Sequence, residues 1–254
     1  MAQQTTFALI TGCSGGIGKE LAKSFAARGV TVLATARSAE SLQDLTSQFN
    51  NIEAFALELD DRESIEKLKE LVTTRTNGRL DFLVNNAGTH YAATAMDLEL
   101  EKAVKLFQVN VFAVMHLCQI FIPLLLRSPQ GRIVQIGSVT RDIPVLWQCA
   151  YNASKAALIT GFVRSNILHH GLYAPDSSLY LPVKNVIEKL KIEGNKNGMP
   201  ADAYAKSVVD KLMQRHVDCE IWQGNLALFL RILLSLFPLR LLVSEPIHDD
   251  ERPC

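Results

Sequence analysis

One stretch decides the fold: residues 7–18, which read FALITGCSGGIG. A short apolar run, residues 7–10, leads directly into a turn rich in glycine, and residues 19–28 then carry apolar side chains at helical spacing. This order predicts a buried strand, a tight turn and the start of a helix. Because the free amides at a helix N-terminus attract anions, the turn is a candidate site for the phosphates of a dinucleotide.

The glycines of this turn have separate expected roles. Gly12 permits the tight turn, Gly16 lets the backbone approach a pyrophosphate, and Gly18 allows the helix to pack closely on the strand. Their spacing is wider than the usual GxGxxG, and a plain surface turn is the alternative interpretation. The residues of the turn predicted to bind the cofactor are Gly12, Ser14, Gly16, Ile17 and Gly18.

Strand and helix patterns alternate through the chain. Further apolar runs predict strands at residues 30–34, 54–59, 80–84 and 132–136. Helical periods occupy residues 41–49, 64–72 and 100–126, the last disturbed at Pro123. The alternation predicts an α/β fold, a Rossmann-like doubly wound parallel sheet. No repeat or linker interrupts it, so we expect one domain over residues 1–224 and an apolar C-terminal extension over residues 225–254.

Composition excludes several classes of protein. Of the 254 residues, 26 are Lys or Arg and 26 are Asp or Glu, so no basic field exists to bind nucleic acid. The five cysteines are scattered without a CxxC pair, which argues against disulfides and against a zinc or other metal site. The N-terminus carries no signal-peptide pattern. We therefore expect a cytoplasmic protein.

The ends of the second and third predicted strands bear on cofactor choice. An acid after the second strand would bind a ribose 2′-hydroxyl, whereas an arginine accommodates a 2′-phosphate. Arg37 occupies that place and favours NADP(H), the alternative being a solvated arginine at a strand end. Asp60 is expected either to accept a hydrogen bond from the adenine amino group or to cap the next helix.

A candidate catalytic pair lies in residues 151–155, YNASK. Tyr151 and Lys155 are one helical turn apart and share a face. Proton transfer to or from a carbonyl or alcohol oxygen is assisted by a phenol with a lowered pKa, and a neighbouring cation favours the phenolate. Ser138, which follows the fifth strand, can hydrogen-bond the substrate oxygen. Alone, a YxxxK pattern is commonplace on surface helices.

Together these residues resemble the short-chain dehydrogenase/reductase superfamily. Its TGxxxGxG, NNAG (residues 85–88), Asn (Asn110), Ser and YxxxK elements occur in order over about residues 5–155. The resemblance implies hydride transfer between a nicotinamide and a carbonyl, with Tyr151 as general acid/base and Ser138 orienting the carbonyl. Lys155 would lower the pKa of Tyr151 and hold the nicotinamide ribose, and Asn110 would complete a proton relay through water. The residues implied to line the cofactor on the central strands are Asn86, Ala87 and Gly88.

Further segments resemble the fungal NADPH-dependent 1-acyldihydroxyacetone-phosphate reductase group and its relatives from secondary-metabolite clusters. These are TGCSGGIG, ATAR, YNASKAAL and SLYLP at residues 178–182. The resemblance implies a lipid-linked or polyketide-like ketone as substrate, and a homo-oligomer is a further expectation. The loops at residues 89–94 and 142–148 place His90, Tyr91 and Trp147 in the expected pocket.

The apolar stretch at residues 225–243 has two open interpretations. Arg231, Pro238 and Arg240 disfavour a bilayer-spanning helix, because a charge near its middle costs about 2.5–3.5 kcal/mol. The stretch either lies on a membrane, such as the endoplasmic reticulum or a lipid droplet, with the arginines reaching water, or packs as a flap over the substrate site or a second subunit.

One departure from the superfamily pattern follows the YxxxK motif. Gly161, which resembles the end of a later loop, lies only six residues after Lys155, too few for a multi-turn helix and a strand. We therefore expect the sixth strand to be missing or altered, with roughly two dozen residues absent. The alternative is that residues 156–170 form a different helix. An NADPH-dependent ketone reductase is the leading hypothesis, and a catalytically weak, truncated isoform acting as a cofactor-binding or membrane-associated scaffold is the competitor.

Overall fold

The computed structural model describes residues 5–141, 145–157, 173–176, 178, 181–195, 198–214, 221 and 223. Its centre is a parallel sheet with strand order β3-β2-β1-β4-β5, as the sequence predicted. The order reverses between β1 and β4, so the crevice for a ligand is expected at the carboxyl ends of those strands. The strands are β1 (Phe7–Ile10), β2 (Thr31–Ala36), β3 (Ile52–Ala56), β4 (Phe82–Asn85) and β5 (Arg132–Gln135).

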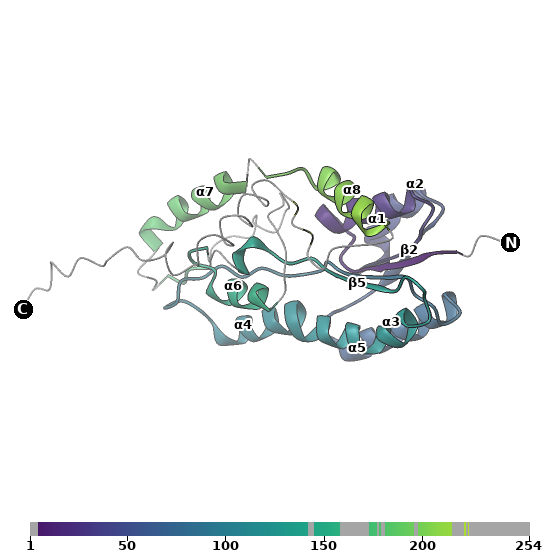
Figure 1. Cartoon of the computed structure of the whole chain (residues 1–254). Coiled ribbons are helices and arrows are strands. Elements are labelled where there is room, and N and C mark those ends of the chain that lie inside the picture. The colour runs from purple at the N-terminus through teal and green to yellow at the C-terminus, as the bar shows by residue number, and fades with distance from the viewer. Residues whose placement is uncertain are drawn as a thin grey trace, which may run out of the picture.

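Helices cover both faces of the sheet (Figure 1). On one face lie α1 (Gly16–Ala26), α2 (Gln43–Gln48) and α8 (Ala201–Leu212), and on the other α3 (Arg62–Arg75), α4 (Leu100–Phe107) and α5 (Ala113–Leu125). Beyond the carboxyl ends of the strands are α6 (Cys149–Ala156) and α7 (Lys184–Asn195). Short 3₁₀ segments are η1 (Ala39–Leu42), η3 (Val139–Arg141) and η5 (Leu181–Val183).

Two apolar cores follow from this layering. Leu21 and Phe25 of α1 are fully buried on one face of the sheet, and Leu117 and Phe121 of α5 on the other. The strands between them are apolar on both sides, as a parallel sheet covered by helices requires. The central β4 is buried throughout.

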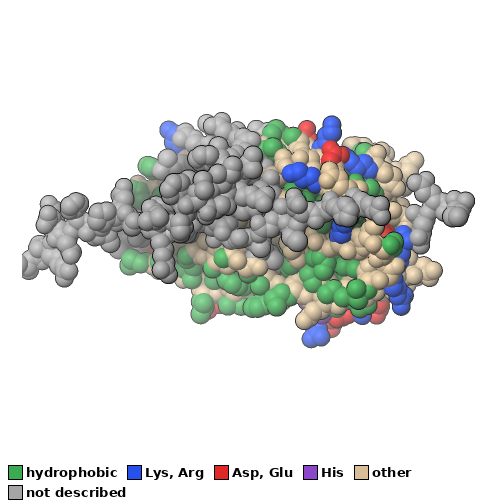
Figure 2. All heavy atoms as spheres, in the orientation of Figure 1, with side chains coloured by type: hydrophobic (Ala, Val, Ile, Leu, Met, Phe, Trp, Pro, Cys, Tyr) green, Lys and Arg blue, Asp and Glu red, His purple; other side chains and the backbone are tan. Residues whose placement is uncertain are grey.

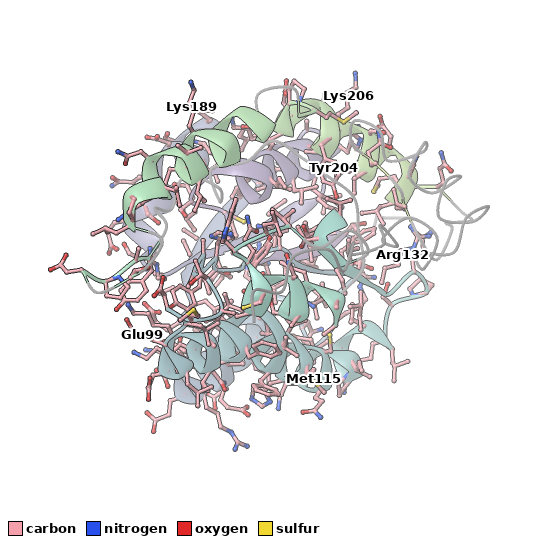
Figure 3. All side chains as sticks on the ribbon, turned by 90° about the vertical axis from the view of Figure 1, so that its left-hand side faces the viewer. Glu99, Met115, Arg132, Lys189, Tyr204 and Lys206 are labelled. Carbon is pink, nitrogen blue, oxygen red and sulfur yellow. The ribbon has the colours of Figure 1, made fainter. Side chains whose placement is uncertain are left out.

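Helix α8 completes the first core, and the sequence analysis did not predict it. Its inward side chains are buried among those of α1 and the strands: Tyr204, Ala205, Val208, Val209 and Leu212. Figure 3 shows Tyr204 directed into the molecule and Lys206 directed away from it. Arg28 pairs with Asp210, and Arg132 donates to the backbone carbonyl of Leu212, so polar contacts near the C-terminal end of α8 reinforce the packing.

The long helix predicted at residues 100–126 is confirmed in extent but differs in detail. Between α4 and α5 lies one π-helical stretch, η2 (Gln108–Phe112). The expected disturbance at Pro123 is wrong, since α5 continues to Leu125 with the proline inside its final turn. By length and hydropathy the span Leu100–Leu125 could cross a membrane, but a core helix passes the same test, and one side of this helix is buried against the sheet.

The outer strand β5 is poorly covered. It pairs with β4, and no second partner strand occurs among the described residues. Ile133, in the middle of the strand, is 41% exposed. Among the described residues β5 is therefore the edge of the sheet, and the expected change in the sixth strand is not contradicted. The predictions for residues 158–170, 220, 222 and 225–254 lie outside the described residues.

Candidate active site

The glycine-rich loop turns tightly between β1 and α1. Gly12 has a φ of +74°, which glycine adopts without a steric penalty. A Cβ atom on Gly18 would overlap the carbonyl oxygen of Gly12 and the amide of Asn86, so only glycine permits this approach. The backbone N–H of Cys13 donates to the carbonyl oxygen of Thr35 (2.8 Å), which anchors the loop to β2.

Asn86 and Ala87 hold this loop in place. Their backbone N–H groups both donate to the Thr11 hydroxyl at 3.0 Å. The Asn86 side-chain amide donates to the carbonyl oxygens of Thr11 (2.8 Å) and Gly12 (3.2 Å). Thr11 is therefore a positioning residue that the sequence analysis missed, although a hydroxyl directly before the first glycine is a visible signal.

The structure of the glycine-rich loop is suited to binding an anion, as the sequence predicted. Helix α1 follows Gly15, and its first turn contains no acidic residue. Ser14 is exposed, whereas Ile17 packs against the core. Free amides without a competing carboxylate suit a pyrophosphate, so the loop fits the phosphates of a dinucleotide.

Arg37 and Asp60 are both exposed and follow β2 and β3. Of the two roles considered for Asp60, the helix cap is wrong, because the N-cap of α3 is its neighbour Asp61. The Asp61 carboxylate accepts a hydrogen bond from the backbone N–H of Glu63 at 2.9 Å. Asp60 remains a candidate for contact with adenine, and Arg37 for contact with a 2′-phosphate.

The structure brings together Ser138, Tyr151 and Lys155. Tyr151 and Lys155 lie on α6 and are each only 4% exposed, although neither belongs to the apolar core clusters. The Ser138 hydroxyl hydrogen-bonds the Tyr151 phenol and also accepts hydrogen bonds from the backbone N–H (3.2 Å) and hydroxyl (3.0 Å) of Thr140. Thr140 thus orients the serine.

Asn110 joins the same cluster through the π-helical stretch. Its Oδ1 accepts from the Thr89 N–H (2.8 Å), and its Nδ2 donates to the Thr89 carbonyl oxygen (3.0 Å) and the Ser154 hydroxyl (3.1 Å). A Cβ atom on Gly88 would lie 3.3 Å from Asn110 Oδ1 and 3.4 Å from Lys155 Nζ. The asparagine therefore ties α6 to the loop after β4, and π-helical turns are frequent at functional sites.

Burial sets the protonation of the pair. It raises the pKa of Tyr151 to about 12, against the opposing effect of the Ser138 hydrogen bond, and it lowers the pKa of Lys155 to about 8. The expected lowering of the Tyr151 pKa by the neighbouring cation is therefore not found. Lys155 Nζ lies 5.8 Å from the phenol ring centre, and the low-polarity surroundings disfavour both charges. Near neutral pH the phenol is protonated and can donate.

Comparison with known proteins identifies the family. The short chain dehydrogenase family profile matches residues 6–171. The chain belongs to this family. A short-chain dehydrogenase of Neurospora crassa, srdE, is 35% identical and covers 93% of this chain and 89% of its own length. The match spans 260 residues, more than the whole of this chain, so the relative carries residues without a counterpart here.

Two further relatives of this short-chain dehydrogenase are informative. The NADPH-dependent 1-acyldihydroxyacetone phosphate reductase of Schizosaccharomyces pombe is 41% identical over 60% of this chain and 51% of its own length. A crystal structure of a short chain dehydrogenase/reductase from Burkholderia phymatum, in complex with NAD, has a TM-score of 0.79 at 18% identity and covers 96% of this chain and 98% of its own. The similarity to the Burkholderia protein shows that the two chains share a fold.

Beside the candidate catalytic residues, the loops that carry His90, Trp147 and Tyr173 contact one another or α6. The His90 ring lies 4.7 Å from the Tyr151 ring, centre to centre. Ala93 N–H donates to the Trp147 carbonyl oxygen (2.9 Å), and Tyr173 N–H donates to the Ala92 carbonyl oxygen (2.9 Å). His90, Tyr91 and Trp147 were predicted in this region, whereas Tyr173 was missed because it follows the altered segment.

Proposed function

We propose that this chain reduces a ketone to an alcohol with NADPH. The observation that carries the proposal is the cluster of Ser138, Tyr151, Lys155 and Asn110 beside the dinucleotide loop. Ser138 fixes the ketone oxygen next to the phenol, and Tyr151 donates its proton to that oxygen as the carbonyl carbon takes the hydride that bound NADPH supplies. The phenol suits this role because it is protonated near neutral pH.

Lys155 and Asn110 complete the proposed proton path. Lys155, with a pKa lowered to about 8 by burial, is protonated at neutral pH and can return a proton toward the phenolate left on Tyr151. Its Nζ also donates to the Ile136 carbonyl oxygen at 3.4 Å, which keeps it at the end of β5, where it would also hold the nicotinamide ribose. Asn110, fixed by Thr89 and Ser154, extends the path to solvent through a water. Gly88, Ala87 and Asn86 would line the cofactor.

Tyr151→Phe tests the reaction. This change removes the acid but keeps the ring, so NADPH consumption with a panel of ketones should fall at least a hundredfold, while NADPH binding, followed by its fluorescence, stays close to that of the unaltered chain. Tyr204→Phe, at a buried position of α8 in the core, is the matched control and should keep the rate. A Tyr151→Phe protein that retained most of its rate would remove Tyr151 as the acid.

Arg37 supports NADPH over NADH. The named cofactors of the relatives differ, NADPH for the fission-yeast reductase and NAD for the Burkholderia complex. The exposed guanidinium after β2 can pair with a 2′-phosphate, a contact worth about 1.5–3 kcal/mol, or roughly tenfold or more in affinity. Arg37→Asp should reverse or erase the preference in a titration with both cofactors. Equal affinities of the unaltered chain for both would contradict the assignment.

The proposed substrate is a lipid-linked or secondary-metabolite ketone. The name of the fission-yeast relative supports a lipid-linked ketone. The proposed location is the cytoplasm, at the surface of the endoplasmic reticulum or a lipid droplet, supported by the apolar residues 225–243. Association with a second copy is supported by the exposed apolar side chains of Val104, Phe112 and Met115, on α4, η2 and α5. Figure 2 shows hydrophobic side chains gathered on this side of the molecule.

A catalytically weak isoform is the second candidate. The short interval between Lys155 and Gly161 favours it, because the helix and strand expected to be lost there would support the nicotinamide end of the site. Such a chain would still bind the adenosine end of the cofactor through the loop at residues 11–18. Cofactor binding without turnover on any ketone would identify this case.

A further inference from the structure

Trp147 has an unusual backbone conformation. Its φ is +60°, a left-handed value that costs a bulky residue about 1–3 kcal/mol. The conformation is held from outside, because the Trp147 carbonyl oxygen accepts the Ala93 N–H at 2.9 Å and Gln148 forms a bridge with Ala93. Backbone strain of this kind concentrates where a side chain must point in a particular direction for function.

The loop that fixes Trp147 also touches the catalytic tyrosine. His90, three residues before Ala93, packs on the Tyr151 ring, and Trp147 comes directly before the N-cap of α6, which carries Tyr151. The indole and the phenol are therefore positioned by one loop and one helix. Trp147 lies only four residues before Tyr151, so a ketone bound at Tyr151 would place its substituent close to Trp147.

The surroundings of Trp147 are apolar. Its indole packs with the buried side chains of Ala92 and Ile187, the latter from α7. Exposed apolar side chains flank both partners in sequence: Val145 and Leu146 before Trp147, and Val183 and Val186 before Ile187. In Figure 3, which looks along the sheet from its carboxyl end, Lys189 of the same helix points outward.

Lys102, on α4, is paired with groups of its own neighbourhood. Lys102 Nζ lies 3.7 Å from the Tyr173 ring centre and 3.0 Å from a Glu99 carboxylate oxygen. The Glu99 N–H in turn donates to the Tyr91 hydroxyl at 3.0 Å. These contacts connect the loop after β4 to Tyr173. Because Glu99 already neutralises the charge of Lys102, this lysine does not favour an anionic substrate group at Trp147.

We propose that Trp147 is a specificity-determining residue whose indole receives the apolar chain or ring of the ketone, in the place that Ile187 fills in this structure. This inference rests on the ketone reduction proposed above and names its substrate class: a ketone with an extended apolar substituent, in preference to a ketone that lacks one. Ligand binding then exchanges the Ile187 side chain for the substituent, and α7 shifts.

Fluorescence tests the contact without turnover. The chain has two tryptophans, so Trp222→Phe leaves Trp147 as the reporter. With NADP⁺ present, 2-decanone should change the indole emission in a saturable way, and acetone and dihydroxyacetone phosphate should not. No change with 2-decanone, or the same change with all three, would overturn the proposal.

Kinetics separates this inference from the reduction itself. Trp147→Gly removes the indole while glycine accepts the left-handed φ, and it should raise the KM for 2-decanone about tenfold or more with little effect on acetone. Trp147→Phe should keep an intermediate KM and covers the case in which the glycine variant fails to fold. Ile187→Ala should lower the KM for 2-decanone, whereas Leu126→Ala, an exposed truncation at the far end of α5, should not.

Failure of the reductase function and failure of the Trp147 proposal give different results. A saturable change in indole emission, with no ketone reduced, would refute the reductase function and leave Trp147 as an apolar binding residue. Ketone reduction in which Trp147→Gly leaves the ratio of the KM values for 2-decanone and acetone unchanged would refute the role of Trp147 and leave the reductase standing.

Discussion

Replacing Lys155 with methionine should stabilise the folded chain although it removes a group that the proposed reaction needs. Lys155 is a buried cation whose pKa falls from 10.5 to about 8 on folding, because burial penalises the charged form. Its ammonium donates a 3.4 Å hydrogen bond to the neutral carbonyl oxygen of Ile136. Methionine has a similar length and no charge to bury.

The size and sign of the expected stability change follow from proton linkage. Since the folded pKa lies below the unfolded pKa, the unfolded chain binds more protons between pH 8 and 10.5, and the stability of the native protein rises with pH across that window. A depression of this size costs about 3 kcal/mol at pH 7, at about 1.4 kcal/mol per pH unit. Near pH 9.5 less than half of the cost remains.

Denaturant unfolding of both proteins at pH 7 and pH 9.5 measures this cost. We expect the free energy of unfolding of Lys155→Met to exceed that of the unaltered chain by up to about 3 kcal/mol at pH 7. This difference should be smaller at pH 9.5. Lys206→Met, on the exposed side of α8, is the control and should follow the unaltered chain at both pH values. The reasoning fails if Lys155→Met is no more stable at pH 7 or if the difference is independent of pH.

Two predictions concern the frame around the site. Leu212→Ala deletes a buried side chain of α8 and should cost about 2–5 kcal/mol, seen as a lower Tm in a thermal melt, whereas Lys206→Ala on the same helix should not; an unchanged Tm would mean that α8 does not seal the core. Restoring about 25 family-like residues between Leu158 and Thr160 should raise both the unfolding temperature and the reductase rate, because a helix and a strand would cover the edge of β5. A chain that melts cooperatively and turns over normally as written would refute this second prediction.

Local sequence patterns were sufficient for the existence of the five strands, whereas the candidate catalytic cluster was recognised through the resemblance to a family. Each strand contains an apolar run followed by a turn, but the expected bounds were displaced: residues 54–59 were expected where β3 is Ile52–Ala56, and residues 80–84 where β4 is Phe82–Asn85. Tyr151, Lys155, Ser138 and Asn110 converge because each follows or lies beside the carboxyl end of a parallel strand. Such convergence follows from topology, and topology follows from the strand and helix alternation.

Other features depend on contacts that no local pattern contains. The inward residues of α8, such as Val208 and Leu212, have helical spacing, but nothing nearby in the sequence says that α1 is their partner. The pKa of Tyr151 depends on how deeply the fold buries it, and the sequence shows only that a cation is one turn away. Asp60 and Asp61 are indistinguishable as caps until the backbone places one of them at the start of α3.

The packing of α8 on α1 also determines when the domain can finish folding during synthesis. Leu21 and Phe25 leave the ribosome early, yet their partners Val209 and Leu212 emerge only after most of the chain has been made. At about 5–20 residues per second, the interval is on the order of ten to forty seconds. Throughout it the apolar side of α1 lacks its cover and depends on chaperones or on transient contacts. A nascent chain released before α8 would carry the whole glycine-rich loop and every residue of the candidate catalytic cluster, and still lack the helix that closes the core behind them.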